Sequence, residues 1–124
     1  MFEVARYEPD PESVTLSRRW VENCLRSEVS PEVIRDATLC ISELTANAVR
    51  HARTTCTVEI VLTGEVLRIS VRDDHPGEPT RFDPDPTSVS GRGLAIVEAV
   101  SRRWGWTRDP AGGKHVWFEL VDPA

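Results

Sequence analysis

Long apolar runs are absent from this sequence of 124 residues. No window approaches the roughly 18 apolar residues of a membrane-spanning helix, and the first residues, "MFEVARYEPDPE", lack the basic and then apolar order of a secretory signal. Cysteine is also scarce: Cys24, Cys40 and Cys56 are widely spaced, with no CxxC pair and no clustered histidine. These absences argue against a disulfide framework and a structural zinc site. We therefore expect a cytoplasmic protein with reduced thiols and no membrane partner.

The sequence also has no excess of basic residues over acidic ones. The formal net charge is −5 at pH 7, which argues against the broad cationic surface that direct nucleic-acid binding needs. The sequence also has no GxxxxGK[ST] phosphate loop, no HExxH metal pair and no hydrolase elbow around a serine. With 40% apolar and 28% charged residues, the composition is that of a folded globular protein, and we expect one domain over residues 1–124.

The first part of the sequence predicts one strand and two helices. Residues 1–8 alternate loosely, as a strand does, and residues 11–28 carry apolar side chains at helical spacing. The strongest helical pattern is "SPEVIRDATLCISELTANAVRHA", residues 30–52. Ser30 suits the N-cap of this helix and Pro31 its first position, and an apolar stripe follows at helical spacing.

The second part predicts two hairpins and a further helix. Residues 55–63 and 66–74 alternate around a Gly-Glu pair, which indicates antiparallel strands. Residues 91–104 carry apolar side chains at helical spacing and predict a helix. Residues 105–120 predict two short strands around an "AGGK" turn. Lys114 lies in this turn and could approach the site, but an exposed turn lysine is more often simply solvated.

Three short segments carry the chemistry, and the first lies on the helix predicted over residues 30–52. Glu43, Asn47 and His51 recur at intervals of four and share one stripe beside the apolar face. A carboxylate can polarise a hydroxyl group or a water molecule, and a side-chain amide oxygen is a suitable ligand for Mg²⁺. Taken alone, the stripe is more simply explained by a solvated helix face.

The other two segments lie where a strand ends and where a helix begins. In "VRDDHPG", Asp73 offers an acceptor to an exocyclic amine such as that of adenine, and Gly77 lets the chain turn close to a ligand. Gly91-Arg92-Gly93 precedes an apolar helix, whose unpaired amides suit a phosphate group. Each segment alone is weak evidence, because acidic turns and glycine-rich helix starts are common.

In this order, however, "ISELTANAVRHA", "VRDDHPG" and "GRGLAIVEAV" resemble the N, G1 and G2 boxes of the histidine-kinase-like ATPase superfamily. The chain is most similar to the stand-alone anti-sigma-factor serine/threonine kinases, notably the short actinobacterial ATP-binding regulators. The resemblance extends from about Pro31 to Leu120 and includes the closing "GGKHVWFEL". It implies the Bergerat fold of the α+β class: a two-layer α/β sandwich whose mixed, mostly antiparallel sheet carries about three helices on one face.

The resemblance also implies a role for each matching residue. Asn47 would bind a Mg²⁺ ion that bridges the ATP phosphates, and Glu43 would be the catalytic base for the attacking hydroxyl group. His51 would lie near the phosphates or serve only in packing. Asp73 would recognise the adenine amine, with Gly77 behind it.

The phosphate end of the ATP site would be formed by the G2 segment. The resemblance assigns cofactor binding there to Gly91, Arg92, Gly93 and Leu94. The proline-rich residues 78–90 would be the lid of the site.

Two positions depart from the family pattern. His75 stands where the usual Asp-x-Gly-x-Gly motif has its first glycine, so its side chain crowds the adenine pocket or requires another turn geometry. Val89 and Ser90 stand where the related kinases carry an arginine that reaches the terminal phosphate. Phosphotransfer is therefore less secure than nucleotide binding.

Alternative functions stay open at this point. The first is a serine/threonine protein kinase that binds Mg·ATP and phosphorylates or sequesters a protein partner in transcriptional control. The resemblance implies a sigma factor or an anti-sigma antagonist as that partner, and a homodimer as the form in which such proteins often occur. The second is a module that regulates its partner by binding alone, and the third is slow ATP hydrolysis without a protein substrate.

Overall fold

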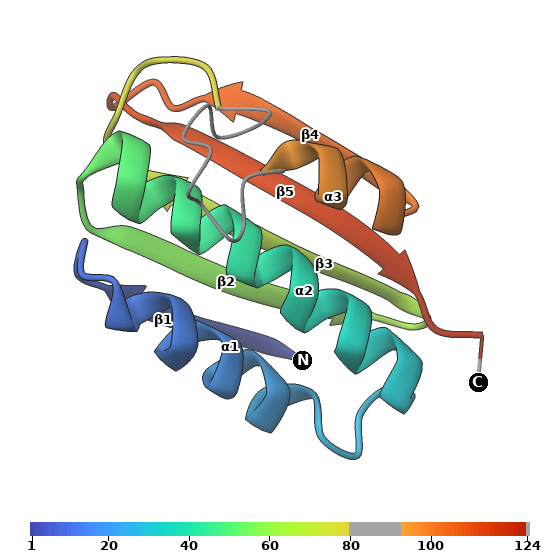
Figure 1. Cartoon of the computed structure of the whole chain (residues 1–124). Helices are drawn as coiled ribbons and strands as arrows, with labels where there is room; N and C mark the ends of the chain where they lie inside the picture. The colour runs from blue at the N-terminus through green and yellow to red at the C-terminus, as the bar shows by residue number, and fades with distance from the viewer. Residues whose placement is uncertain (80–92, 124) are drawn as a thin grey trace.

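The chain folds into two layers, a sheet and a set of helices on one of its faces (Figure 1). The computed structural model describes residues 1–79 and 93–123; Gly91, Arg92 and residues 80–90 of the expected lid lie outside the described residues. Within the described residues the strands are β1 (Phe2–Tyr7), β2 (Cys56–Thr63), β3 (Val66–Asp73), β4 (Arg103–Arg108) and β5 (Lys114–Val121). The helical segments there are α1 (Glu12–Leu25), α2 (Pro31–Asn47), η1 (Ala48–Ala52) and α3 (Leu94–Val100).

The strands lie in the order β1-β2-β3-β5-β4, and each neighbouring pair is antiparallel. Alternate side chains of the three central strands face the helices and are buried, as the period of a strand requires. These residues are Cys56, Val58, Ile60, Leu67, Ile69, Val71, Val116, Phe118 and Leu120. The sheet and its helical cover confirm the predicted α+β two-layer fold, and both predicted hairpins are present.

Helix α2 crosses the middle of the sheet and begins as its sequence predicts. The Ser30 hydroxyl accepts a hydrogen bond from the backbone N–H of Val33 at 3.3 Å, and Pro31 follows at the first helical position. The backbone N–H of Ser30 itself donates to Asp122 Oδ2 at 3.1 Å, which ties the start of α2 to the chain after β5. The buried face of α2 includes Ala37 and Ile41, which pack into the core.

The α-helix does not continue to residue 52 as predicted. From Ala48 to Ala52 the chain forms a single π-helical turn, η1, which closes when the N–H of Arg53 donates to the carbonyl oxygen of Ala48 at 2.8 Å. Arg53 has a φ of 57°, in the left-handed region, and this ends the helix. Single π-helical turns inside helices are frequent at functional sites, and this one carries His51.

The helix predicted over residues 91–104 is shorter in the structure, and the prediction was wrong at its end. Helix α3 stops at Val100, where the backbone N–H and hydroxyl of Ser101 both donate to the carbonyl oxygen of Val97. Trp104 belongs to β4 and lies opposite Phe118 of β5. The error has a physical cause: Trp104 faces the core from a strand, so its apolar character also fits a helical period.

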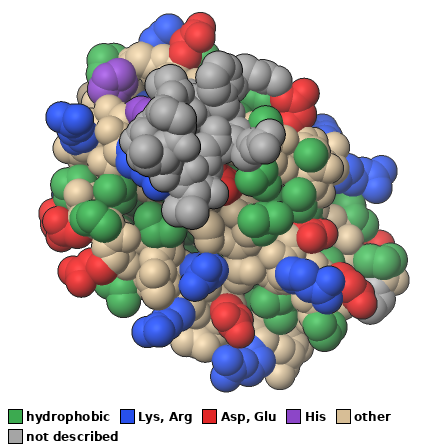
Figure 2. All heavy atoms as spheres, viewed as in Figure 1, with side chains coloured by type: hydrophobic (Ala, Val, Ile, Leu, Met, Phe, Trp, Pro, Cys, Tyr) green, Lys and Arg blue, Asp and Glu red, His purple; other side chains and the backbone are tan. Residues whose placement is uncertain are grey.

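On the helical side, charges of both signs lie across the described part of the surface, in keeping with the mixed composition of the sequence. Acidic and basic side chains of the described residues are interspersed with apolar ones on this face (Figure 2). The described helices also include none that is long and apolar enough to cross a membrane.

Candidate functional site

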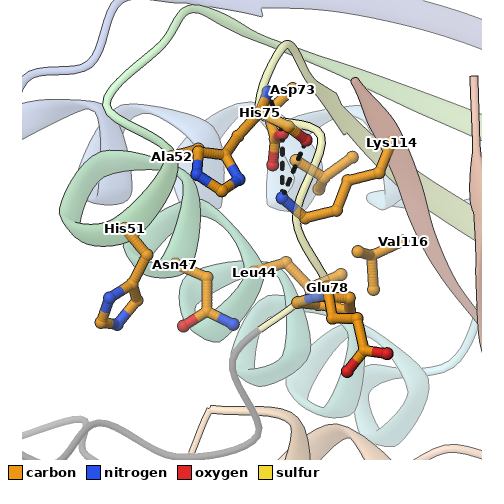
Figure 3. A pocket seen from close by; sticks show the side chains of 11 residues that line it. Leu44, Asn47, His51, Ala52, Asp73, His75, Glu78, Lys114 and Val116 are labelled. Carbon is orange, nitrogen blue, oxygen red and sulfur yellow. Dashed lines mark hydrogen bonds and ion pairs between the residues drawn. The ribbon is translucent and has the colours of Figure 1, made fainter. Parts of the chain in front are cut away.

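A cavity of about 440 Å³, including its open mouth, lies where α2 and η1 approach the ends of β3 and β5 (Figure 3). One part of its wall is apolar and is formed by Leu44, Ala52, Val71, Pro79 and Val116. The other part is polar and is formed by Asn47, His51, Asp73, His75, Glu78 and Lys114. An apolar pocket with a few convergent polar groups is the usual form of a small-molecule site.

Two residues of the predicted helix stripe reach this cavity. Asn47 is the last residue of α2, and His51 lies one turn further on in η1. Both line the cavity (Figure 3). The Nε2 atom of His51 is buried and has no hydrogen-bond partner among the described residues. A buried polar atom without a partner costs free energy, so a ligand that supplies one would bind favourably here.

Glu43 is placed differently, because it does not line the cavity. Its side chain is only 5% exposed and makes a hydrogen bond with the backbone of Gly93, next to the start of α3. Burial raises the pKa of this carboxyl group, although the Gly93 hydrogen bond and the charge of Arg50 oppose the increase. Glu43 therefore joins α2 to the segment that the sequence predicts as the phosphate end.

The N-terminal end of α3 is described only in part. Gly93 has a φ of 47° and precedes the helix, so its backbone adopts a conformation that favours glycine. The side chain of Leu94 is 1% exposed and packs in the core, so only its backbone could contact a ligand.

Asp73 and Lys114 form a buried ion pair in the cavity wall. They lie opposite each other in the register of β3 and β5, and Lys114 Nζ is 3.1 Å from Asp73 Oδ1. Each residue is only 5% exposed. The interpretation of Lys114 as a solvated turn residue was therefore wrong, because Lys114 begins β5 on the buried face that continues with Val116. Its alternation with Val116 and Phe118 was the sequence signal that could have revealed this.

His75 and Gly77 shape the turn after β3. The backbone N–H of His75 donates to Asp73 Oδ1 at 2.9 Å, and the N–H of Gly77 donates to His75 Nδ1 at 3.0 Å. A Cβ atom on Gly77 would lie 2.7 Å from Cε1 of the His75 ring. The absence of a side chain at Gly77 therefore accommodates the imidazole, which lines the cavity where the family motif usually has a glycine.

A second polar cluster holds the β4–β5 turn against β3, and sequence reasoning did not reveal it. Arg72 donates to Asp109 Oδ2 and Asp74 Oδ1, both at 2.7 Å, and to the carbonyl oxygen of Gly112 at 2.9 Å. The Arg72 hydrogen bond lowers the pKa of Asp109 to about 2, and the backbone N–H of Ala111 adds to the effect. This cluster fixes the turn that leads into Lys114.

The sequence profile of the histidine kinase-like ATPase domain matches residues 7–120, and the chain belongs to this family. Membership of the family implies ATP binding. A comparison with curated protein sequences gives no match.

Solved structures resemble this chain, and they include the following two. The structure of the RsbU and RsbW domains of Rv1364c from Mycobacterium tuberculosis has 21% identity and a TM-score of 0.73, over 97% of this chain and 32% of that longer chain. The histidine kinase domain of the blue-light activated histidine kinase from Erythrobacter litoralis EL346 has 28% identity and a TM-score of 0.48, over 73% of this chain and 45% of that chain. The first similarity shows that the fold is shared.

Proposed function

We propose that this chain binds Mg·ATP in the cavity beside α2 and transfers phosphate to a serine or threonine of a protein partner, as anti-sigma-factor kinases do. The observation that carries the proposal is the convergence of Asn47, His51 and Asp73 on one cavity. Asn47 and His51 come from one motif of the sequence and Asp73 from another, and the family to which the chain belongs implies ATP binding. The protein partner would be a sigma factor or an antagonist of an anti-sigma factor.

The cavity suits a purine nucleotide in its chemistry. Its apolar wall offers contacts to the faces of a base, and the Asp73 carboxylate offers an acceptor for the base edge. The Nε2 atom of His51, which lacks a partner in the part of the chain that the structure describes, is a further polar group that a nucleotide could satisfy. His75 narrows the pocket next to Asp73, so we expect weaker binding than a glycine at this position would allow.

The polar side chains of the cavity also suit a Mg²⁺ ion that binds together with the nucleotide. The described residues contain no cluster of three or more His, Cys, Asp or Glu side chains that could hold a metal alone. Asn47 supplies one amide oxygen, and Mg²⁺ commonly takes few protein ligands when phosphate oxygens supply others. When bound, the ion would neutralise charge on the phosphates.

Glu43 is the residue to which we assign general-base catalysis. The hydroxyl group of the partner would lose its proton to this carboxylate while its oxygen bonds to the terminal phosphorus atom. The bond between that phosphorus and the bridging oxygen would break at the same time, and ADP would leave with the electron pair. The raised pKa of Glu43 favours this role, because a base is most effective when its pKa is nearer to the working pH. Its hydrogen bond with Gly93 keeps it beside the start of α3, where the family motif binds phosphates.

Calorimetric titration of Mg·ATP tests the nucleotide site. Asp73→Asn and Asn47→Ala should each weaken binding by about tenfold or more, because each removes a charged or metal-ligating contact. Asn23→Ala on the exposed side of α1 and Asp10→Asn in the exposed turn before α1 are matched controls. Thermal unfolding of each variant verifies that it is folded. Equal affinity in all the variants, or no binding by the wild type, would reject the site.

A binding-only function is the second candidate, and His75 is the observation that favours it. An imidazole in place of a glycine at the base pocket can reduce nucleotide affinity while the protein surface stays intact. Proteins from a native extract that bind to the immobilised chain can be incubated with it and with ATP labelled at the terminal phosphate. Label transfer that Glu43→Gln abolishes supports the kinase; partner binding with no transfer supports the binding module, and phosphate release by the isolated protein indicates hydrolysis.

A further inference from the structure

Lys114 is the single lysine of the sequence, and it is buried in the cavity wall. Its Nζ atom lies 3.1 Å from Asp73 Oδ1 and 3.4 Å from the carbonyl oxygen of His75 (Figure 3). Burial of an ammonium group is costly unless it is paired, and Asp73 supplies the pairing charge. The fold therefore places the Lys114 ammonium group beside the Asp73 carboxylate, which would form hydrogen bonds with the base of the nucleotide.

The pair leaves hydrogen-bonding capacity on both partners. In the described part of the chain, the contacts of the Asp73 carboxylate are with Lys114 and the N–H of His75, and both are made by Oδ1. An ionised carboxylate has a second oxygen, and an ammonium group has three donors, of which Lys114 uses two on Asp73 and His75. The cavity wall can therefore offer a ligand one acceptor and one donor side by side.

A carboxylate acceptor alone selects different bases from a carboxylate that has an ammonium donor beside it. A lone carboxylate pairs with the amine of a 6-aminopurine but faces the oxygen of a 6-oxopurine, which leaves two acceptors opposed and unsatisfied. With a donor beside it, a 6-oxopurine can accept from the lysine on O6 and donate its N1–H to the carboxylate. A 6-aminopurine can donate its amine to the carboxylate and accept from the lysine on N1.

We propose that Lys114 is a specificity-determining residue that makes this pocket accept 6-oxopurine nucleotides as well as adenine nucleotides. The inference rests on the proposed nucleotide site and adds the range of bases that the site binds. Lys114 acts here through its ammonium donor, which is held in place by Asp73 and the carbonyl oxygen of His75.

Calorimetric titration of the wild type with Mg·ATP and Mg·ITP tests this inference. Inosine triphosphate has the 6-oxo group and N1–H but lacks the 2-amino group of guanine, so it probes the relevant edge without added bulk. We expect the two affinities to agree within about tenfold, whereas a pocket that rejects the 6-oxo group would prefer ATP by about a hundredfold or more. A preference of that size in the wild type overturns the inference.

Lys114→Met provides the second test, because it removes the donor and keeps an unbranched side chain of similar length. The variant should lose about tenfold or more in affinity for ITP relative to ATP. Arg68→Met is the matched control: Arg68 lies over the Trp117 ring at 3.9 Å, away from the cavity lining, and its ATP to ITP ratio should equal that of the wild type.

The outcomes separate this inference from the proposed function. Binding of ATP with rejection of ITP overturns only the role of Lys114, as does an unchanged ratio in folded Lys114→Met. Failure of the wild type to bind either nucleotide rejects the proposed function and this inference together. Removal of Lys114 leaves Asp73 unpaired, and if the variant does not fold, the wild-type ratio still decides the question.

Discussion

Gly113 lies directly against the main chain of Asp73. A Cβ atom on Gly113 would stand 2.1 Å from the carbonyl oxygen of Asp73 and 2.9 Å from the Cα of Asp74. Because these are backbone atoms, they cannot move aside without shifting the end of β3. This close approach brings the β4–β5 turn onto the strand end that carries Asp73, and it positions the following residue, Lys114.

Gly113→Ala should therefore destabilise the protein and weaken nucleotide binding. The added methyl group would meet the Asp73 carbonyl and would also force alanine into a φ of 87°. We expect a loss of about 3 kcal/mol or more in the free energy of unfolding, together with lower ATP affinity. Denaturant unfolding and calorimetric titration measure the two effects.

The neighbouring glycine provides a matched control. Gly112 has a φ of 100°, but a Cβ atom there has nothing within 4 Å. Gly112→Ala should therefore cost only the backbone strain, about 1–2 kcal/mol, and leave ATP affinity near that of the wild type. Equal effects of the two substitutions would show that the contact with Asp73 does not matter.

A second prediction concerns His51, for which the sequence left both packing and ligand roles open. Its buried Nε2 has no hydrogen-bond partner within residues 1–79 and 93–123, which imposes a cost of about 1–3 kcal/mol on the nucleotide-free protein. His51→Leu should thus leave the stability of that form unchanged or higher while reducing ATP affinity by about tenfold. Thermal unfolding without nucleotide and calorimetric titration measure the two quantities.

His115 is the appropriate comparison for His51. Its Nε2 lies 3.1 Å from Asp109 Oδ2, and it does not line the cavity. His115→Leu should leave ATP affinity unchanged and slightly reduce stability. If His51→Leu instead lowers stability and does not affect binding, His51 has a packing role alone.

Glu43→Gln distinguishes the effect of Glu43 on the stability of the protein from its proposed role as general base. Burial raises the pKa of Glu43 above its ordinary value of 4.5, so ionisation is harder in the folded state than in the unfolded state. The resulting cost is absent at low pH and appears as pH rises through the folded-state pKa. We expect the glutamine variant to be at least as stable as the wild type at pH 7 and to lose phosphotransfer.

Thermal unfolding across the pH range measures this prediction. The stability advantage of Glu43→Gln should disappear when pH falls below the ordinary glutamate pKa of 4.5. Glu32→Gln in the exposed first turn of α2 serves as the control for removal of a helix carboxylate. A stability difference that is the same at every pH would contradict the assigned cost of ionisation.

The secondary structure was largely predictable because periodicity and capping are local properties of the sequence. The Ser30 cap, the buried face of α2 and the alternation in β2, β3 and β5 all follow from neighbouring residues. The π-helical turn was not predictable in this way, since it depends on one hydrogen bond from Arg53 to Ala48. The end of α3 was also missed, because a core-facing tryptophan fits a strand and a helix equally well.

Of the residues that the sequence proposes for the site, Asn47, His51 and Asp73 line the cavity, but their arrangement was not predictable. Intervals of four placed Glu43 with Asn47 and His51, but contact with Gly93 holds Glu43 outside the cavity that the other two line. Lys114 was misread because its burial depends on Asp73, which lies 41 residues earlier in the chain. The alternation of Lys114 with Val116 and Phe118 was a local signal that Lys114 faces inward, but its pairing with Asp73 is a property of the folded sheet and has no local signal.

The cluster around Arg72 predicts a loss of stability in acid that can be assigned to one group. The Arg72 hydrogen bond and the N–H of Ala111 hold the pKa of Asp109 at about 2, below its ordinary value of 3.8. The stabilisation is therefore present above pH 3.8 and is lost as pH falls through about 2. Asp109→Asn should be less stable than the wild type at pH 7, and the difference should shrink over this acidic range. Urea unfolding at several pH values measures it.

Arg72→Met should show the same behaviour, because Arg72 is the main cause of the lowered pKa. If the two side chains act as one unit, Asp109→Asn combined with Arg72→Met should cost less than the sum of the single substitutions. Both single variants should also weaken ATP binding, since Arg72 holds the Gly112 carbonyl in the turn before Lys114. Additive costs, together with a pH-independent difference for Asp109→Asn, would show that the lowered pKa has another origin.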